Sequence, residues 1–327
     1  MMPFRYSLML VGAVLLAGCG GGTDPAQPGA NVAPPSLGPN VLVFDSDRTG
    51  SYQIFSMHTD GSNVSQLSSD PNADSWWPQL SPDRARILFY RAPKGVHDTD
   101  YSKASLWVMN VDGSDLSELR PVGTDGWSIQ EHAEWSPDGS RLVMAGGTTT
   151  LQIYVTDTSG KNPSRITDGS GYWLDPSWSP DGKRLAIVGC TFTPCQPSDY
   201  EVYTVAANGS GGLVRVSSDA LPDYDPSYSP DGTRIAWLTE TQPPSATFPA
   251  GVWNIRIAGL DGSGLGYVTN DDEINSKPDW STDGNVIYFH RFVYGETHWQ
   301  IYSVQADGAG LGLIGGGQPG NDEYPDE

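Results

Sequence analysis

The sequence predicts an all-β repeat fold, a β-propeller, because a turn sequence recurs at regular spacing with short apolar strands between its copies. Ser-Pro-Asp-Gly occurs three times and has two degenerate copies, at 81–84, 136–139, 179–182, 229–232 and 281–284. A second turn runs in step with it and is centred on Gly61, Gly113, Gly160, Gly209, Gly262 and Gly308. The mean period of about 49 residues lies in the range of propeller repeats.

The turn sequence has a clear conformational meaning. Proline presets φ for the second position of a type I turn, aspartate suits the third, and glycine takes the positive φ that follows. Ser-Pro-Asp-Gly is therefore predicted to connect two strands of a hairpin. Its aspartates are predicted to serve the turn rather than catalysis.

Each repeat is predicted to hold four antiparallel strands, here called A to D. In the repeat around Ser179, strand A ends at 176–179, strand B follows at 184–188, strand C covers 201–205 and strand D covers 213–217. Apolar, β-branched and aromatic residues bounded by turns are typical of strands. Six such four-stranded blades, arranged radially and stacked on one another, make a six-bladed propeller.

The two ends of the chain predict how the ring closes. Residues 39–44 look like strand B of a repeat, as at 284–289, and residues 321–325 look like the lead-in to strand A, as at 222–226. The N-terminal and C-terminal strands are therefore expected to pair within one shared blade. The C-terminal strand would be the innermost strand of that blade.

The repeat resembles a known family. The segment Pro176 to Ala186, Pro-Ser-Trp-Ser-Pro-Asp-Gly-Lys-Arg-Leu-Ala, together with Arg165-Ile166-Thr167, is similar to the WD40-like (PD40) repeat of TolB-type β-propellers. The resemblance covers about residues 38–327 and implies a six-bladed propeller in the bacterial envelope. The chain differs from TolB in having a linker where TolB has an N-terminal α/β domain.

The charge balance restricts the partners. The chain has 18 basic and 39 acidic residues, a formal net charge of −21. Such a surface repels phosphate backbones, so no nucleic-acid partner is expected. It suits cationic partners or metal ions, although an acidic surface can also simply be solvated.

The N-terminal segment is predicted to be processed. Residues 1–18 form a lipoprotein signal peptide, with Arg5 before the apolar stretch 8–16, which is too short to span a membrane. Leu16-Ala17-Gly18-Cys19 resembles the bacterial lipobox, which implies a lipid on Cys19; the alternative is an ordinary signal peptide. Residues 19–38 are a flexible Gly/Pro-rich tether, and residues 39–327 are the propeller. We expect an envelope lipoprotein, anchored in the outer membrane and facing the periplasm or the surface.

Two further cysteines are expected to pair. With Cys19 lipidated, Cys190 and Cys195 remain as an even pair in an exported protein, so we predict a disulfide between them. A zinc site does not suit this spacing, because Cys-x₄-Cys has no second pair.

The connections from strand D to strand A are expected to ring the mouth of the central channel. They are predicted to place aromatic and acidic residues there as a candidate binding collar: Asp74, Trp76, Trp77, Trp127, Glu131, His132, Tyr172, Trp173, Asp175, Asp223, Tyr224, Asp225, Asp271, Asp272, Glu273, Asp322, Glu323 and Tyr324. Two interpretations stay open. The aromatics wedge between blades and the acids cap loops, or the collar binds a peptide, a sugar or a hard cation such as Ca²⁺. No other cofactor is expected, and no metal ligands are assigned.

Sequence motifs of common enzymes are absent, including Gly-x-Ser-x-Gly, His-Glu-x-x-His and the P-loop. We therefore expect a monomeric, non-catalytic scaffold that binds an envelope protein or peptide through its loop-rich face. The alternative is a carbohydrate-active lyase or hydrolase with a divalent metal at the channel mouth, because His132 stands beside Glu131 among aromatics that suit sugar stacking. Oligogalacturonate lyases, propellers with related repeats, use histidines and a divalent metal.

Overall fold

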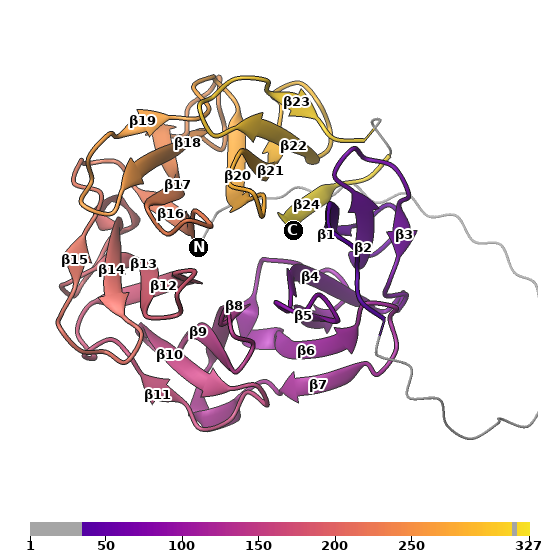
Figure 1. Ribbon diagram of the computed structural model, residues 1–327, viewed down its shortest axis with the longest axis horizontal. Coiled ribbons are helices and arrows are strands. Elements are labelled where there is room, and N and C mark those ends of the chain that lie inside the picture. The colour runs from indigo at the N-terminus through magenta and orange to yellow at the C-terminus, as the bar shows by residue number, and fades with distance from the viewer. Residues whose placement is uncertain (1–34, 316–318) are drawn as a thin grey trace, which may run out of the picture.

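The chain folds into antiparallel sheets arranged around a central axis (Figure 1). This computed structural model describes residues 35–315 and 319–327. The predicted signal peptide, Cys19 and most of the predicted tether lie outside the described residues. None of the described helices is long and apolar enough to cross a membrane.

Four of the sheets have four antiparallel strands each. The first combines β1 (Val41–Ser46), β2 (Gln53–His58) and β3 (Ser65–Gln66) with β24 (Asp322–Asp326). The second holds β4 (Ala73–Leu80), β5 (Arg86–Pro93), β6 (Ser105–Asn110) and β7 (Ser117–Arg120). The third holds β8 (Ile129–Trp135), β9 (Arg141–Gly147), β10 (Leu151–Asp157) and β11 (Ser164–Arg165). The fourth holds β12 (Tyr172–Trp178), β13 (Arg184–Cys190), β14 (Glu201–Ala206) and β15 (Val214–Arg215).

The fifth sheet has eight strands. They are β16 (Asp223–Tyr228), β17 (Arg234–Gln242), β18 (Val252–Gly259), β19 (Gly266–Tyr267), β20 (Ile274–Trp280), β21 (Val286–Phe292), β22 (Gln300–Gln305) and β23 (Gly312–Leu313). The blades are four-stranded and antiparallel as predicted, and the described strands form four separate four-stranded sheets besides this eight-stranded one. One parallel bridge between Trp253 and Ile274 joins β18 to β20 and merges two sets of strands.

Three short 3₁₀ helices lie in the connections between strands. They are η1 (Tyr101–Lys103), η2 (Thr124–Gly126) and η3 (Pro197–Asp199).

The first and last described strands pair, as the sequence predicted. β24 runs antiparallel to β1, with Val43 opposite Asp326 and Ser46 opposite Asp322. β24 is the end strand of its sheet and lies near the axis in Figure 1. The chain end therefore contributes an inner strand to the sheet in which the described fold begins.

The Ser-Pro-Asp-Gly turns have the predicted conformation. At the turn from β12 to β13, the Ser179 hydroxyl donates to Asp181 Oδ1 at 2.7 Å, and the Gly182 N–H donates to the Ser179 carbonyl at 2.8 Å. Gly182 has φ = 66°, a value that favours glycine. The hydroxyl partner and the backbone N–H of Lys183 at 3.0 Å lower the pKa of the exposed Asp181. These contacts support the turn role predicted for the aspartates.

The core lies between neighbouring sheets. One buried cluster joins Val143 of β9, Ile187 of β13 and Trp237 of β17. Arginines at the start of a second strand also cover the aromatic ring at the end of the next inner strand. The distances are 4.7 to 4.8 Å in the pairs Arg86–Trp135 and Arg141–Trp178, which join neighbouring sheets, and Arg234–Trp280, which joins the two halves of the eight-stranded sheet. Sheets that cannot bury both faces alone are stabilised by such stacking.

The predicted disulfide between Cys190 and Cys195 is present, with Cα atoms 6.2 Å apart. It closes the loop that follows β13 and leads through η3 into β14.

Candidate functional site

The inner strands share one repeated irregularity. In β4, β8, β12, β16, β20 and β24, two residues oppose a single residue of the partner strand, which is a β-bulge. The first bulge residue has a positive φ of 47° to 56° in every case: Trp77, His132, Asp175, Asp225, Lys277 and Tyr324. Positive φ is uncommon outside glycine, so its repetition identifies six equivalent positions.

Proline explains how the sequence encodes these bulges. It occupies the second bulge position in five of the six strands: Pro78, Pro176, Pro226, Pro278 and Pro325. Proline has no N–H to donate, and it is tolerated in sheets at bulges. The inner strands therefore continue through a residue that usually ends a strand, and they turn one side chain per strand toward the axis.

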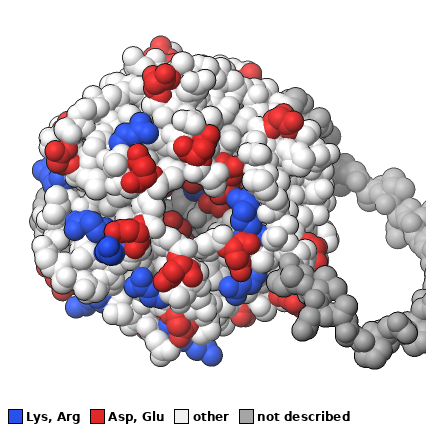
Figure 2. Space-filling model, viewed as in Figure 1, with Lys and Arg blue, Asp and Glu red and all other residues white. Residues whose placement is uncertain are grey.

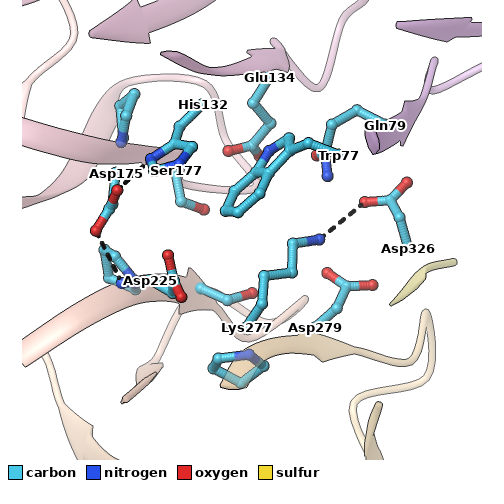
Figure 3. A pocket seen from close by; sticks show the side chains of 14 residues that line it. Trp77, Gln79, His132, Glu134, Asp175, Ser177, Asp225, Lys277, Asp279 and Asp326 are labelled. Atoms are coloured by element: carbon cyan, nitrogen blue, oxygen red, sulfur yellow. Dashed lines mark hydrogen bonds and ion pairs between the residues drawn. The ribbon is translucent and has the colours of Figure 1, made fainter. Parts of the chain in front are cut away.

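An open cavity lies where the inner strands converge. Figure 3 shows its lining, which combines the first bulge residue of five inner strands, the bulge proline of three of them, and the residue two positions after the first bulge residue in all six. The lining residues are Trp77, Gln79, His132, Glu134, Asp175, Pro176, Ser177, Asp225, Pro226, Ser227, Lys277, Pro278, Asp279 and Asp326. In Figure 2 the centre of the molecule is hollowed, with Asp and Glu side chains around the hollow.

The cavity lining is predominantly acidic. Its titratable residues are five carboxylic acids, one lysine and one histidine: Glu134, Asp175, Asp225, Asp279, Asp326, Lys277 and His132. A cleft lined mainly by one sign of charge concentrates ligands of the opposite sign. This cavity is therefore suited to cationic groups.

Three of the bulge side chains form one cluster. The ligand atoms of His132, Asp175 and Asp225, from the consecutive inner strands β8, β12 and β16, lie within 4.8 Å of one another. His132 Nδ1 contacts Asp175 Oδ1, and Asp175 Oδ2 accepts the backbone N–H of Asp225 at 3.2 Å. The Trp77 ring stacks on the His132 ring with centroids 4.1 Å apart.

Burial perturbs the ionisation of this region. It raises the pKa of Asp225 to about 8, and the neighbouring Asp175 adds to the effect. Burial also raises the pKa of Glu134 to about 8 and that of Glu131 to about 7. For His132, burial acts to lower the pKa, but the Asp175 carboxylate outweighs it and raises the pKa to about 10. At neutral pH the cluster thus holds a protonated imidazole and resists full ionisation of its acids.

The acids two positions after the bulges tie neighbouring inner strands together. Glu134 accepts the N–H of Trp178 at 3.3 Å, Asp279 that of Glu327 at 3.0 Å, and Asp326 that of Leu80 at 2.7 Å, each from the next sheet. These three carboxyls therefore have structural roles, which sets them apart from the His132 cluster.

Comparisons with known proteins agree with this architecture. The family model described as the TolB beta propeller domain (PD40) matches residues 96–245. The chain contains a TolB-like β-propeller. Two curated relatives match parts of it: an uncharacterized protein of Agrobacterium fabrum, 30% identical over 104 residues, and a TolB homolog of Chlorobium luteolum, 29% identical over 138 residues. The first match covers 31% of this chain and 34% of the relative, and the second covers 42% and 28%. The matched segments thus span about a third or less of each relative.

Solved structures share the fold. The putative TolB of Agrobacterium tumefaciens superposes with a TM-score of 0.61 at 19% identity, covering 84% of this chain and 87% of that one. TolB of Acinetobacter baumannii superposes with a TM-score of 0.67 at 17% identity, and the match covers 88% of this chain and 66% of that one. An oligogalacturonate lyase of Vibrio parahaemolyticus superposes with a TM-score of 0.53 at 12% identity, and the match covers 81% of this chain and 86% of that one. At these identities the likeness concerns the fold alone.

Four of the predicted collar residues line the cavity of the TolB-like propeller: Trp77, His132, Asp175 and Asp225. Their predicted place in the connections before the inner strands is wrong, because the inner strands begin several residues earlier than expected. Trp127 and the acids at 271–273 do precede an inner strand. The other collar residues lie within inner strands: Asp74, Trp76, Glu131, Tyr172, Trp173, Asp223, Tyr224, Asp322, Glu323 and Tyr324.

Most of the remaining collar acids have structural partners. These pairs are Asp74 with the N–H groups of Tyr52 and Gly95, Asp223 with Thr239, Asp271 with Arg291, Asp272 with Gln242, Glu273 with the N–H of Tyr294, Asp322 with Arg48, and Glu323 with Tyr52. For these acids the structure favours the loop- and strand-capping interpretation.

The collar aromatics divide between the core and the channel mouth. Trp76 and Trp173 are buried in the core, and Trp127 packs on Tyr154 with ring centroids 4.3 Å apart. The Tyr324 hydroxyl donates to Asp98 at 2.5 Å. Four aromatic rings continue from one to the next across two sheets, at centroid distances of 5.5 to 6.0 Å: Tyr172, Tyr200, Tyr224 and Trp253.

Sequence reasoning missed several cavity residues, notably Glu134, Lys277, Asp279 and Asp326. The Lys277 ammonium donates to the Pro325 carbonyl at 3.1 Å and lies 3.8 Å from Asp326 Oδ1. The signal that could have found Lys277, Asp279 and Asp326 is the repeated X-Pro step of the inner strands, which marks the bulge and the lining position after it. For Glu134 this signal is missing, because β8 has Ala133 in place of the proline.

Proposed function

We propose that this chain is a lipid-anchored cell-envelope propeller that binds a protein or peptide partner, without catalysis, at its central channel. The observation that carries the proposal is the acidic cavity on the axis, with aromatic side chains beside it. The TolB-like fold supports a protein-binding scaffold, because propellers of this kind bind proteins in general.

The propeller is proposed to be a closed ring of six blades. Six equivalent bulges support this count, and among the described strands a single parallel bridge pairs the two halves of the eight-stranded sheet. The pairing of β24 with β1 supports closure through the terminal strands. An experimental structure with fewer blades, or with β24 detached from β1, would contradict this arrangement.

The partner segment is proposed to be basic. Five carboxylic acids line the cavity against one lysine and one histidine, so a lysine or arginine of the partner would meet negative charge there as these acids lose their protons. Trp77 lines the cavity, and the partly buried rings of Tyr172 and Tyr224 lie on the inner strands that supply Asp175 and Asp225, where they offer apolar and cation–π contacts. Binding of such a segment should weaken as salt rises.

The binding proposal is tested by affinity capture of the lipidated full chain from its own envelope, followed by mass spectrometry. The test variant is Tyr172→Ala/Tyr224→Ala. The matched control is Val64→Ala/Leu116→Ala, which removes two exposed apolar side chains near outer strands. We expect the same proteins with wild type and control, and their loss with the test variant. Full retention by a folded test variant would overturn the assignment of the site.

The envelope location is proposed from the lipobox around Cys19 and is supported by the Cys190–Cys195 disulfide, since disulfides persist in oxidising compartments. Cys19→Ser should abolish incorporation of labelled fatty acid and move the protein from the membrane fraction to the soluble fraction. Unchanged labelling and fractionation would exclude the anchor.

A second candidate function is a carbohydrate-active lyase or hydrolase that uses a divalent metal at the channel mouth. The His132–Asp175–Asp225 cluster favours it, and the fold is shared with an oligogalacturonate lyase. A screen of polysaccharides with and without divalent ions tests it by ultraviolet absorbance of unsaturated products and by reducing-end formation. Absence of any product across the screen would remove this candidate.

A further inference from the structure

We infer that His132, Asp175 and Asp225 form a binding site for one divalent transition-metal ion, such as Zn²⁺ or Mn²⁺. The three residues occupy the same bulge position on consecutive inner strands, and all three line the axial cavity. The site lies within the channel of the proposed function but does not depend on the proposed partner, because the isolated chain supplies all three ligands.

The geometry suits a shared ion. The three ligand atoms lie within 4.8 Å of one another. Imidazole nitrogen and carboxylate oxygen bind zinc at about 2.0–2.2 Å, so ligands of one ion stand roughly 3–4 Å apart. Small side-chain rotations would therefore bring all three onto one ion. The repeated backbone conformation, with φ of 48° to 52° at these residues, fixes where the side chains start.

The Asp225 carboxylate supplies a second observation. In the described part of the chain, no hydrogen bond to this carboxylate is formed. Asp175 is 4% exposed, and its Oδ1 forms an ion pair with His132 Nδ1 inside the cluster. A carboxyl group enclosed in this way without a donor is stabilised by a proton or a cation.

The ligand types select the class of metal. Calcium takes six to eight oxygen ligands, whereas one imidazole with two carboxylates is a nitrogen–oxygen set that suits zinc or manganese. The Ca²⁺ expected from the sequence is therefore replaced in this proposal by a transition metal. Three protein ligands leave coordination positions open toward the cavity.

Neighbouring residues provide an orienting contact and a reporter. The Asp225 N–H donates to Asp175 Oδ2, which holds one oxygen and directs the other toward His132. Trp77 stacks on the His132 ring, so a paramagnetic ion in the site lies next to an indole. Mn²⁺ bound at the site should quench the fluorescence of Trp77. The Trp77→Phe variant lacks this indole, so the difference in quenching between wild type and variant reports binding at this site.

The test uses the lipidated full chain in detergent, stripped with a chelator, and titrates Zn²⁺, Mn²⁺ and Ca²⁺ separately by calorimetry. We expect one Zn²⁺ or Mn²⁺ per chain and a rise in melting temperature. His132→Gln and Asp225→Asn should each weaken binding roughly tenfold or more. The control Asp279→Asn removes a carboxylate from the same cavity outside the ligand set, and it should bind the metal as the wild type does.

Circular dichroism of the metal-free variants keeps the result interpretable, because a folded Asp225→Asn that no longer binds metal supports the site directly. Equal metal affinity in wild type and both ligand variants would overturn the inference. The inference would also be overturned if Ca²⁺ bound more tightly than Zn²⁺ and Mn²⁺, or if no ion bound at all. Partner capture is measured separately, so failure of one proposal is distinguishable from failure of the other.

Discussion

The Asp326 carboxylate accepts a hydrogen bond at 2.7 Å from the backbone N–H of Leu80, a residue 246 positions away in the sequence. Asp326 ends β24 and Leu80 ends β4, so this bond joins the sheet that holds both chain ends to the next sheet. On its other side Asp326 faces the Lys277 ammonium at 3.8 Å. One buried carboxyl group thus links three inner strands around the axis.

Replacing Asp326 with alanine should destabilise the propeller by about 2–3 kcal/mol. The change leaves the Leu80 N–H without its acceptor and removes the partner of the buried Lys277 ammonium. Asp326→Asn keeps an acceptor for Leu80 and should recover part of the loss. Urea unfolding of the three proteins checks this, and wild-type stability in Asp326→Ala would show that the contact contributes nothing.

The arginine–aromatic contacts between sheets should contribute measurably to stability. Arg141 Cζ lies 4.7 Å from the centre of the Trp178 ring, and its guanidinium also donates to the Gly182 carbonyl. Arg141→Ala should lower the free energy of unfolding by about 1–2 kcal/mol, because it removes both the cation–π contact and the packing of the aliphatic stem. Lys183→Ala is the control, since its ion pair with Asp181 is highly exposed and should contribute almost nothing. Similar losses in both variants would contradict the assignment.

The turns and the strand order were predictable because their causes are local. Ser179 to Gly182 form the turn from their own side chains and backbone, with no help from distant residues. The disulfide was predictable from the number of cysteines. Pairing of β24 with β1 followed from comparing both chain ends with complete repeats.

The site was only partly predictable because its geometry depends on the bulges. Asp175-Pro176 looked like a lead-in that ends before the strand, since proline usually breaks a strand ladder. In the structure β12 starts at Tyr172, and the bulge turns Asp175 toward the axis. Repeat spacing places His132 and Asp175 in equivalent positions, but only the backbone conformation shows that both side chains reach one cavity.

Breaking the disulfide should destabilise the loop after β13 more than the remaining structure. Cross-linking a short loop contributes about 2 kcal/mol in the chain-entropy model. Cys190→Ala/Cys195→Ala and reduced wild type should therefore melt at similar, lower temperatures, and proteases should cut first between 191 and 199. Thiol titration confirms reduction. Unchanged melting of fully reduced wild type would contradict this prediction.

The pH dependence of stability should depend in part on Asp279. Burial raises its pKa to about 7 from 3.8, and the nearby Asp326 adds to the increase. The folded state therefore keeps a proton on Asp279 between about pH 4 and pH 7, where the unfolded chain has lost it. The contribution of Asp279 to the free energy of unfolding is therefore fully present at low pH, and it is lost as the pH rises from about 4 to 7.

Asp279→Asn should remove this contribution to the pH dependence. Asparagine cannot ionise, and its carbonyl oxygen can still accept the Glu327 N–H that Asp279 accepts at 3.0 Å. We expect the variant to gain ~1–3 kcal/mol of stability relative to wild type between pH 5 and pH 8, since three pKa units correspond to at most ~4 kcal/mol. Urea unfolding at both pH values checks this. Asp279 also contributes to the raised pKa of the buried Glu134, so the difference between the two proteins includes the response of that neighbour. An equal gain at pH 5 and pH 8 would mean that asparagine acts through packing rather than through the lost ionisation.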